Sequence, residues 1–214
     1  IDLSKVKSIG AYAFSGDVLN VYKGQDLADT SGNEVVDADG NYVYKYYSPK
    51  FTEIDLSNAT KIGADAFGFC MDLTKVTLSS LLTVIPEGAF RSCEKLEEIN
   101  LGSVVKIDGY AFHKTALTAL ELTSAESIGD FAFLECSALT SVGFSDKINS
   151  LGEGAFAYCP TLATVTGMKF IDRLGDYSFA YTDVKEADLT EAKYIGTHAF
   201  MKEKADRTEF KLVL

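Results

Sequence analysis

Cysteine is the residue type in this sequence with the widest chemistry, because a thiolate can bind a metal, act as a nucleophile or form a disulfide. All the cysteines occupy one position, three residues after a recurring phenylalanine; they are Cys70, Cys93, Cys136 and Cys159. The same position elsewhere holds Asp17, Thr115, Thr182 or Glu203. A position fixed by a repeat indicates a buried packing role, with the weak S–H donor facing loop carbonyls.

Zinc binding is disfavoured because the C-x2-4-C spacing of zinc sites is absent. Disulfides between neighbouring copies of the repeat, Cys70 with Cys93 and Cys136 with Cys159, are geometrically possible. We therefore predict buried free thiols, keep these disulfides as the alternative, and predict neither a metal site nor a cofactor.

The histidines and the one calcium-like segment do not form a catalytic set. His113 and His198 lie at different repeat positions with no partnered nucleophile, which favours surface imidazoles. Residues 37–41 (Asp-Ala-Asp-Gly-Asn) resemble the start of an EF-hand, but Tyr42 and Ser48 stand where its glycine and glutamate belong. The sequence also lacks G-x-S-x-G, H-E-x-x-H and phosphate-binding glycine loops. We predict that the protein is not an enzyme.

Composition excludes several classes of partner. The 214 residues are 47% hydrophobic, and 20 basic against 31 acidic residues give a net charge of −11. An acidic surface argues against nucleic acid and anionic lipid, and no apolar run is long enough to insert into a membrane. Residues 1–4 repeat the Ile-Asp-Leu-Ser of residues 54–57, inside a repeat, so we expect a piece of a longer protein without its export signal.

The element that positions these residues is a phrase, I-G-x-x-A-F-x-x-C-x-x-L-x-x-I-x-L, that recurs along nearly the whole chain. Its anchoring residues recur every 21 to 23 positions from the second onward; they are Phe14, Phe67, Phe90, Phe112, Phe133, Phe156, Phe179 and Phe200. A fixed period in this range is typical of a solenoid. We predict one elongated, monomeric domain over residues 1–214, with about eight coils.

Each half of the phrase predicts its own structure. L-x-x-I-x-L predicts a short strand in which Val76 and Leu78 point inward while Lys75 and Thr77 point outward. I-G-x-x-A-F predicts a turn, in which glycine permits either a backbone conformation closed to other residues or a close approach of coils. Ala-Phe should begin a short helical or 3-10 segment. Stacked coils should align the phenylalanines in an aromatic spine. Loops one residue shorter than the usual six steps follow Phe112 and Phe179, and we expect them to leave the core undisturbed.

An insertion at about residues 16–50 interrupts the regular spacing of the repeats, because Phe14 and Phe67 are 53 residues apart. Within it, residues 34–38 and 41–46 flank Asp39-Gly40, which predicts a β-hairpin. The alternating Tyr42, Tyr44 and Tyr46 should share one side of that hairpin. This segment is either a cap over the open end of the solenoid or a binding site.

The full phrase resembles the BspA-like leucine-rich repeats of bacterial cell-surface proteins, over roughly residues 1–14 and 51–200. This resemblance implies an α/β solenoid, a right-handed superhelix with a parallel sheet on its concave face and short helical or 3-10 turns opposite. It also implies an extracellular or surface-anchored protein engaged in adhesion, with no catalytic residues to carry over. The insertion departs from the family pattern.

Outward residues of the predicted strands are the second set of candidate ligand contacts. We name Lys75, Thr77, Glu98, Asn100, Glu121, Thr164 and Thr166. Small uncharged side chains in the middle of this face would let a partner approach the sheet, although a solvated face is the plain alternative. We predict a non-enzymatic adhesion module that binds an extracellular protein or glycan. The alternatives are a structural spacer within a larger surface protein and a cytoplasmic scaffold.

Overall fold

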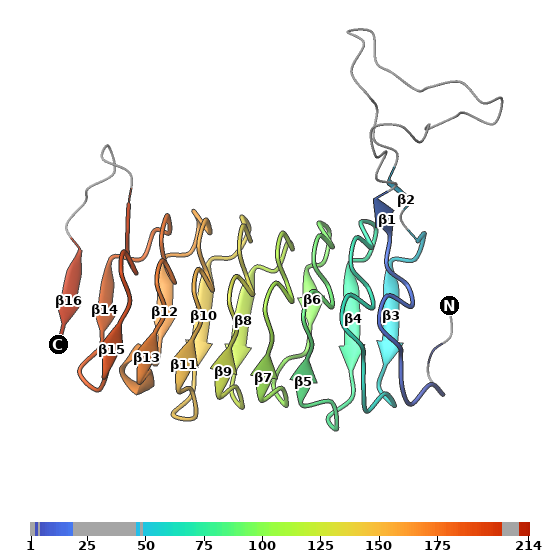
Figure 1. Ribbon diagram of the computed structural model, residues 1–214, viewed down its shortest axis with the longest axis horizontal. Helices are drawn as coiled ribbons and strands as arrows, with labels where there is room; N and C mark the ends of the chain where they lie inside the picture. Colours follow the sequence, from blue (N-terminus) through green and yellow to red (C-terminus); the bar gives the residue numbers. More distant parts are fainter. Residues whose placement is uncertain (1–2, 4, 19–45, 48, 203–209) are drawn as a thin grey trace, which may run out of the picture.

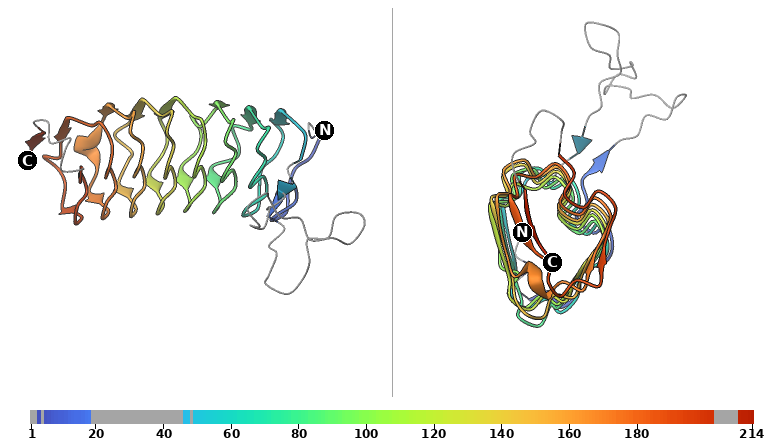
Figure 2. Two further views of the ribbon diagram at one scale, coloured as in Figure 1. Left: turned by 90° about the horizontal axis from the view of Figure 1, so that it is seen from above. Right: turned by 90° about the vertical axis from the view of Figure 1, so that its left-hand side faces the viewer.

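The computed structural model describes residues 3, 5–18, 46–47, 49–202 and 210–214. These residues form a parallel β-solenoid of about seven turns, in which each coil of the chain lies against the next (Figures 1 and 2). The coils follow one another in a nearly straight row, without the curvature that we expected (Figure 1). The described part of the chain contains no long apolar helix of the kind that crosses a membrane.

The longer strands follow the L-x-x-I-x-L half of the phrase and form three parallel sheets, stacked along one side of the rod. The first sheet contains β3 (Glu53–Leu56), β4 (Lys75–Leu78) and β6 (Glu98–Ile99). The second contains β8 (Ala119–Leu122), β10 (Ser141–Phe144) and β12 (Thr164–Thr166), and the third contains β14 (Glu186–Asp188) and β16 (Lys211–Val213). In β4, Val76 and Leu78 are buried while Lys75 and Thr77 are exposed, which confirms the predicted faces.

A second side of the rod carries one parallel sheet of six short strands, each ending at the isoleucine or leucine of the I-G half of the phrase. The strands are β5 (Val84–Ile85), β7 (Lys106–Ile107), β9 (Ser127–Ile128), β11 (Ser150–Leu151), β13 (Arg173–Leu174) and β15 (Tyr194–Ile195). Equivalent residues pair in register from coil to coil, as Ile107 does with Ile128. This register keeps every copy of the phrase at the same angular position around the rod.

The predicted aromatic spine is confirmed. Ring planes of consecutive anchoring phenylalanines lie within 2–12° of parallel, and their centroids are 5.0–5.6 Å apart from Phe14 to Phe200. The side chains of the five anchoring phenylalanines from Phe67 to Phe156 are completely buried. Each stacked pair adds about 0.5–1.5 kcal/mol beyond the burial of its area. One continuous column therefore connects the coils along the whole rod.

The predicted helical turns are not confirmed, because the backbone N–H groups of the Ala-Phe segment bond to the next coil and not within a helix. The N–H groups of Phe131, Phe133 and Glu135 each donate to a carbonyl oxygen of the next coil, at 2.7–3.0 Å. A helix would instead direct these groups along its own axis. Bonding between coils satisfies the buried backbone, and it recurs in the coils from Phe14 to Phe179. The one helical element in the described residues is the 3-10 helix Met168–Phe170, η1.

Two residues in each turn from Phe67 to Phe179 adopt left-handed backbone angles, which lets alternate N–H groups face the neighbouring coil. They lie two residues before and two residues after the phenylalanine, as Phe131 (φ 58°) and Glu135 (φ 58°) do around Phe133. The motif glycine before this turn permits close packing, since a Cβ on Gly129 would lie 2.7 Å from the backbone nitrogen of Gly109. The predicted approach of coils at this glycine is thus confirmed.

The two shortened loops break the longer-strand sheets. No strand pairing joins β6 to β8 or β12 to β14 in the described residues, and β8 and β14 are the strands that follow Phe112 and Phe179. Leu117 and Val184, which end these loops, remain 1% exposed, so the core is undisturbed as predicted. The missing residue instead changes the outer backbone, and each short loop begins a new sheet.

The insertion is described only at its base. There β1 (Asp17–Val18) pairs antiparallel with β2 (Tyr46–Tyr47). The predicted hairpin at residues 34–46 lies outside the described residues except for Tyr46.

Candidate functional site

The cysteines form a buried ladder that connects coils. All of them are free thiols with no exposed surface, as predicted. Each sulfur donates to the carbonyl oxygen of the anchoring phenylalanine in the preceding coil, as Cys136 does to Phe112 and Cys159 to Phe133, both at 3.1 Å. Burial raises the pKa of the Cys93 thiol, and the hydrogen bond with Cys136 together with burial raises that of Cys159. Cys93 and Cys159 are therefore poor nucleophiles. At Cys136 burial opposes ionisation, but hydrogen bonds with Cys159 and Thr115 outweigh it and lower the thiol pKa.

Threonine replaces cysteine in the two short loops and bonds differently. Thr115 Oγ1 donates to Phe112 O at 3.0 Å, and Thr182 Oγ1 donates to Phe179 O at 2.8 Å. Each hydroxyl therefore donates to a carbonyl of its own coil, whereas each thiol donates to the coil before it. Thr115 Oγ1 also lies 3.3 Å from Cys136 Sγ of the next coil. Neither threonine donates to the phenylalanine carbonyl of the preceding coil, although Thr123 Oγ1 still donates to Gly102 O at 3.1 Å across the first break.

The histidines lie in separate coils and have structural contacts. His113 is half-buried, with Nε2 3.5 Å from Glu135 Oε1, and burial lowers the pKa of its imidazole. The His198 ring stacks on Tyr177 at 5.1 Å. Across the described residues, no group of three or more His, Cys, Asp or Glu side chains is placed to hold a metal ion.

The candidate contacts on the strands lie on the outer face of the longer-strand sheets. Lys75 Nζ pairs with Glu98 Oε2 at 2.7 Å, and this contact raises the pKa of Lys75. The Asn100 amide is engaged by the backbone of Leu78, accepting from its N–H at 2.7 Å and donating to its carbonyl at 3.1 Å. Three of these predicted contacts therefore have partners within the protein.

The remaining predicted ligand contacts lie on two different sheets and in the insertion. Thr77 is exposed on β4 of the first sheet, whereas Glu121, Thr164 and Thr166 are exposed on β8 and β12 of the second sheet. Because pairing is interrupted between β6 and β8, the predicted face is not one continuous sheet. Tyr42 and Tyr44 lie outside the described residues, and for Tyr46 only the backbone is described. These residues remain predictions.

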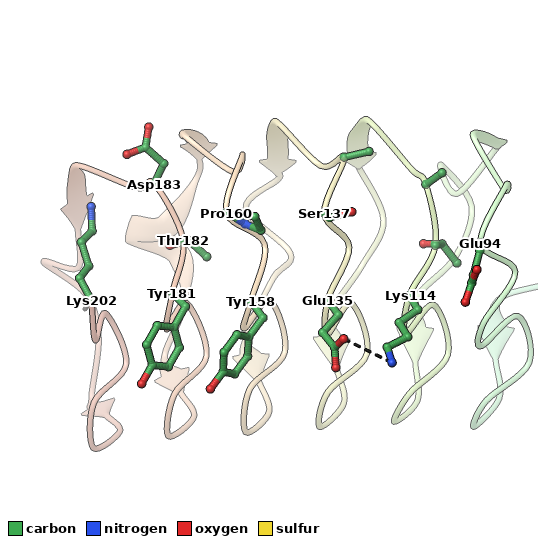
Figure 3. A pocket seen from close by; sticks show the side chains of 13 residues that line it. Glu94, Lys114, Glu135, Ser137, Tyr158, Pro160, Tyr181, Thr182, Asp183 and Lys202 are labelled. Atoms are coloured by element: carbon green, nitrogen blue, oxygen red, sulfur yellow. Dashed lines mark ion pairs between the residues drawn. The ribbon is translucent and has the colours of Figure 1, made fainter. Parts of the chain in front are cut away.

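A groove lies on another face of the rod. It has a volume of about 990 Å³ and crosses the coils that contain Phe90 to Phe200 (Figure 3). Its lining residues are Glu94, Lys114, Thr115, Ala116, Glu135, Ser137, Ala138, Tyr158, Pro160, Tyr181, Thr182, Asp183 and Lys202. Both short loops contribute, since Thr115 lies toward one end and Thr182 toward the other. The groove and the sheet breaks therefore involve the same shortened loops.

Repeat position explains which side chains line the groove. Two residues after the phenylalanine, successive coils place Lys114, Glu135, Tyr158, Tyr181 and Lys202 in one row, as Figure 3 shows. A second row, four residues after the phenylalanine, contains Glu94, Ala116, Ser137, Pro160 and Asp183. Comparing copies of the phrase at these two positions would have identified both rows in the sequence.

A pair of stacked tyrosines lies in the middle of the first row. The rings of Tyr158 and Tyr181 are 4.5 Å apart and 19° from parallel, and Tyr158 is 52% exposed. On the other side of Tyr158 in this row, Lys114 Nζ pairs with Glu135 Oε2 at 3.4 Å. The arrangement combines exposed aromatic surface with charges of both signs, which are features of recognition surfaces.

The fold does not require tyrosine at these positions. Tyr158 and Tyr181 have left-handed backbone angles (φ 56° and 59°), which glycine and asparagine adopt more readily than bulky residues. Other coils place Ser92 or Lys114 at the same position. The strain of about 1 kcal/mol per residue is comparable to the gain from stacking, about 0.5–1.5 kcal/mol. Stability therefore gives little reason for this pair.

Comparison with known proteins follows the repeat. A family model described as BspA type leucine rich repeat region matches residues 40–125 and 105–212, with six copies. No protein of curated function matches the sequence.

Two similar solved structures share the fold. A leucine-rich repeat protein from Bacteroides ovatus ATCC 8483 is 22% identical with a TM-score of 0.51, and the match covers 76% of this chain and 52% of that protein. A leucine rich cell surface protein from Faecalibacterium prausnitzii A2-165 is 18% identical with a TM-score of 0.56, over 98% and 65% of the two chains. This chain thus spans about half of the first and about two thirds of the second. Because the family model matches most of its length, the chain belongs to the BspA-type leucine-rich repeat family.

Proposed function

We propose that the protein is a non-enzymatic binding module of a bacterial cell surface and that its groove holds an extracellular partner. The observation that carries this proposal is the stacked pair of the exposed Tyr158 and the half-buried Tyr181 inside a groove of about 990 Å³. Tyrosine provides contact area and a hydroxyl while losing little side-chain entropy on binding. A volume of about 990 Å³ lies at the upper end of the range for small-ligand pockets, which is about 300–1,000 Å³.

The chemistry of the described residues supports binding rather than catalysis. The thiols are buried and bonded to carbonyl groups, and the histidines lie in separate coils with structural partners. An acid–base or nucleophilic mechanism needs such groups within hydrogen-bond reach of one another and of a substrate. The surface location is supported by family membership and by the cell-surface protein with the same fold.

Binding to arrays of extracellular matrix proteins and glycans tests this proposal. We expect wild-type protein to bind at least one member, and the double variant Tyr158→Asn with Tyr181→Asn to lose that binding. Asparagine suits the left-handed backbone, so the variant should remain folded. Tyr110→Asn is the matched control, because Tyr110 is also left-handed (φ 55°) and exposed but lies outside the groove.

The other predicted surfaces provide a comparison within the same experiment. A variant at Thr77, Thr164 and Thr166 tests the outer sheet face, and a variant at Tyr42, Tyr44 and Tyr46 tests the insertion. If either of these removes binding while the Tyr158 and Tyr181 variant retains it, the groove is not the site. If wild-type protein binds no member of the arrays, the structural spacer becomes the better account.

A further inference from the structure

The charged side chains that line the groove differ in sign between its two ends. Glu94 lies at one end and Lys202 at the other, as Figure 3 shows. Between them, Glu135 contacts Lys114 at 3.4 Å, and Asp183 pairs outside the groove lining with Lys185 at 3.5 Å. Among the described residues, neither Glu94 nor Lys202 has an ion-pair partner. Within the described residues, the groove charges without an ion-pair partner are therefore an acid at one end and a base at the other.

We infer that the groove binds an extended polypeptide segment in one direction. A basic residue of the segment lies against Glu94, an apolar or aromatic residue lies against Tyr158 and Tyr181, and an acidic residue lies against Lys202. This inference rests on the proposed function and adds the class of partner and its orientation. Complementary charges at the two ends would set the direction of binding.

The length of the groove fits such a segment. Glu94 and Lys202 belong to coils five steps apart, which at about 4.8 Å per step gives about 24 Å. An extended chain rises about 3.3 Å per residue, so about seven steps, or eight residues, span this length. The tyrosines lie three and four steps from Glu94, at about 14 and 19 Å, so the apolar residue belongs at the fifth or sixth position from the basic end.

The charges favour a polypeptide over a glycan. An acidic glycan would meet Glu94, Glu135 and Asp183 in the groove, on a protein with a net charge of −11. A neutral glycan would leave the charges at both ends uncompensated. A polypeptide provides a cation, an apolar group and an anion in a fixed order along one chain. It therefore complements all three parts of the groove.

Selection from a phage-displayed library of random eight-residue peptides tests the inference, with the full chain as immobilised target. We expect the enriched peptides to share a basic residue near one end, an apolar or aromatic residue at the fifth or sixth position, and an acidic residue near the other end. Synthetic peptides with the same residues in reverse order should bind at least about tenfold more weakly. Failure to enrich peptides, or enrichment without this order, would overturn the inference.

Variants of the protein connect the selected peptides to the groove. Lys202→Glu should weaken a selected peptide at least about tenfold and should select a basic residue in place of the acidic one. Lys147→Glu is the matched control, because Lys147 is exposed and lies outside the groove. The Tyr158→Asn and Tyr181→Asn variant should lose the peptide, whereas Tyr110→Asn should retain it. Equal binding by all of these variants would contradict the assignment.

A glycan array, used in parallel, distinguishes a failure of the polypeptide inference from a failure of the groove as the binding site. Binding of a glycan that depends on Tyr158 and Tyr181, without ordered peptides, would overturn the polypeptide inference and leave the groove as the binding site. If neither peptides, extracellular proteins nor glycans depend on these tyrosines, the proposed function fails as well.

Discussion

Removing one ring from the middle of the phenylalanine column is the sharpest test of how the solenoid is held together. Phe133 has no exposed surface and stacks on Phe112 at 5.2 Å and on Phe156 at 5.0 Å. Phe133→Ala leaves a cavity between two coils and interrupts both ring pairs. The expected loss of unfolding free energy is about 3–5 kcal/mol. For a chain of this length, that corresponds to a fall in melting temperature of about 6–20 °C.

Thermal and urea unfolding followed by circular dichroism measure this loss, and a neighbouring residue provides the control. Phe131 is two residues away, its ring is only partly buried, and it stacks on Tyr110 outside the column. Phe131→Ala should therefore cost about 1 kcal/mol. If the two substitutions lower stability equally, or if Phe133→Ala has little effect, the column does not hold the coils together and the reasoning is refuted.

Three further predictions concern the thiols, one surface carboxylate and the insertion. The cysteines should resist a thiol reagent in the native protein and all react once it is denatured, whereas a mass two protons lower for each pair before reduction would establish disulfides. Hydrogen bonds from Lys95 and Lys50 lower the pKa of Asp72 from 3.8 to about 2, so its contribution to stability is present above pH 3.8 and is lost as the pH falls toward 2. Titration by NMR should give this midpoint and Lys95→Ala should raise it; an unchanged midpoint would contradict the assigned cause. Replacing residues 18–46 with a short Gly-Ser link should destabilise the protein if the insertion is a cap and should remove partner binding if it is a site, and no change in either property would contradict both.

The sequence predicted the features that depend on repetition. Val76 and Leu78 are buried because residues two apart on a strand share a face, and this pattern is visible in every copy. The phenylalanine column and the buried thiols follow from one residue type at one repeat position. Each feature depends on stacking similar coils, so the period alone was sufficient to predict it.

The turns were predicted incorrectly in detail because local preference competes with bonding between coils. Ala-Phe segments are compatible with helix, and an isolated segment has no other partner for its N–H groups. In the solenoid, the neighbouring coil provides carbonyl acceptors, as Ala155 does for the Phe133 N–H at 2.8 Å. Left-handed angles at Phe131 and Glu135 make this possible. Tertiary bonding therefore overrides the local preference.

The groove was missed because it depends on differences between copies rather than on their similarity. One-residue deletions after Phe112 and Phe179 left the core unchanged, as expected, yet each coincides with the start of a new sheet. The groove also combines side chains from several coils, of which only the rows at fixed repeat positions are readable in the sequence. The outer strand residues were chosen instead because alternation marks them as exposed, which does not show whether a face is hollow.

The most direct test of the central claim is NMR of protein with isotope-labelled tyrosine rings, titrated with the tightest-binding protein, peptide or glycan from the selections. Single Tyr→Asn variants assign the signals of Tyr110, Tyr158 and Tyr181. We predict that ring signals of Tyr158 and Tyr181 shift in proportion to the fraction bound, while the Tyr110 signal stays in place. Saturable binding that leaves Tyr158 and Tyr181 unshifted would show that the partner binds elsewhere and would contradict the groove as the functional site.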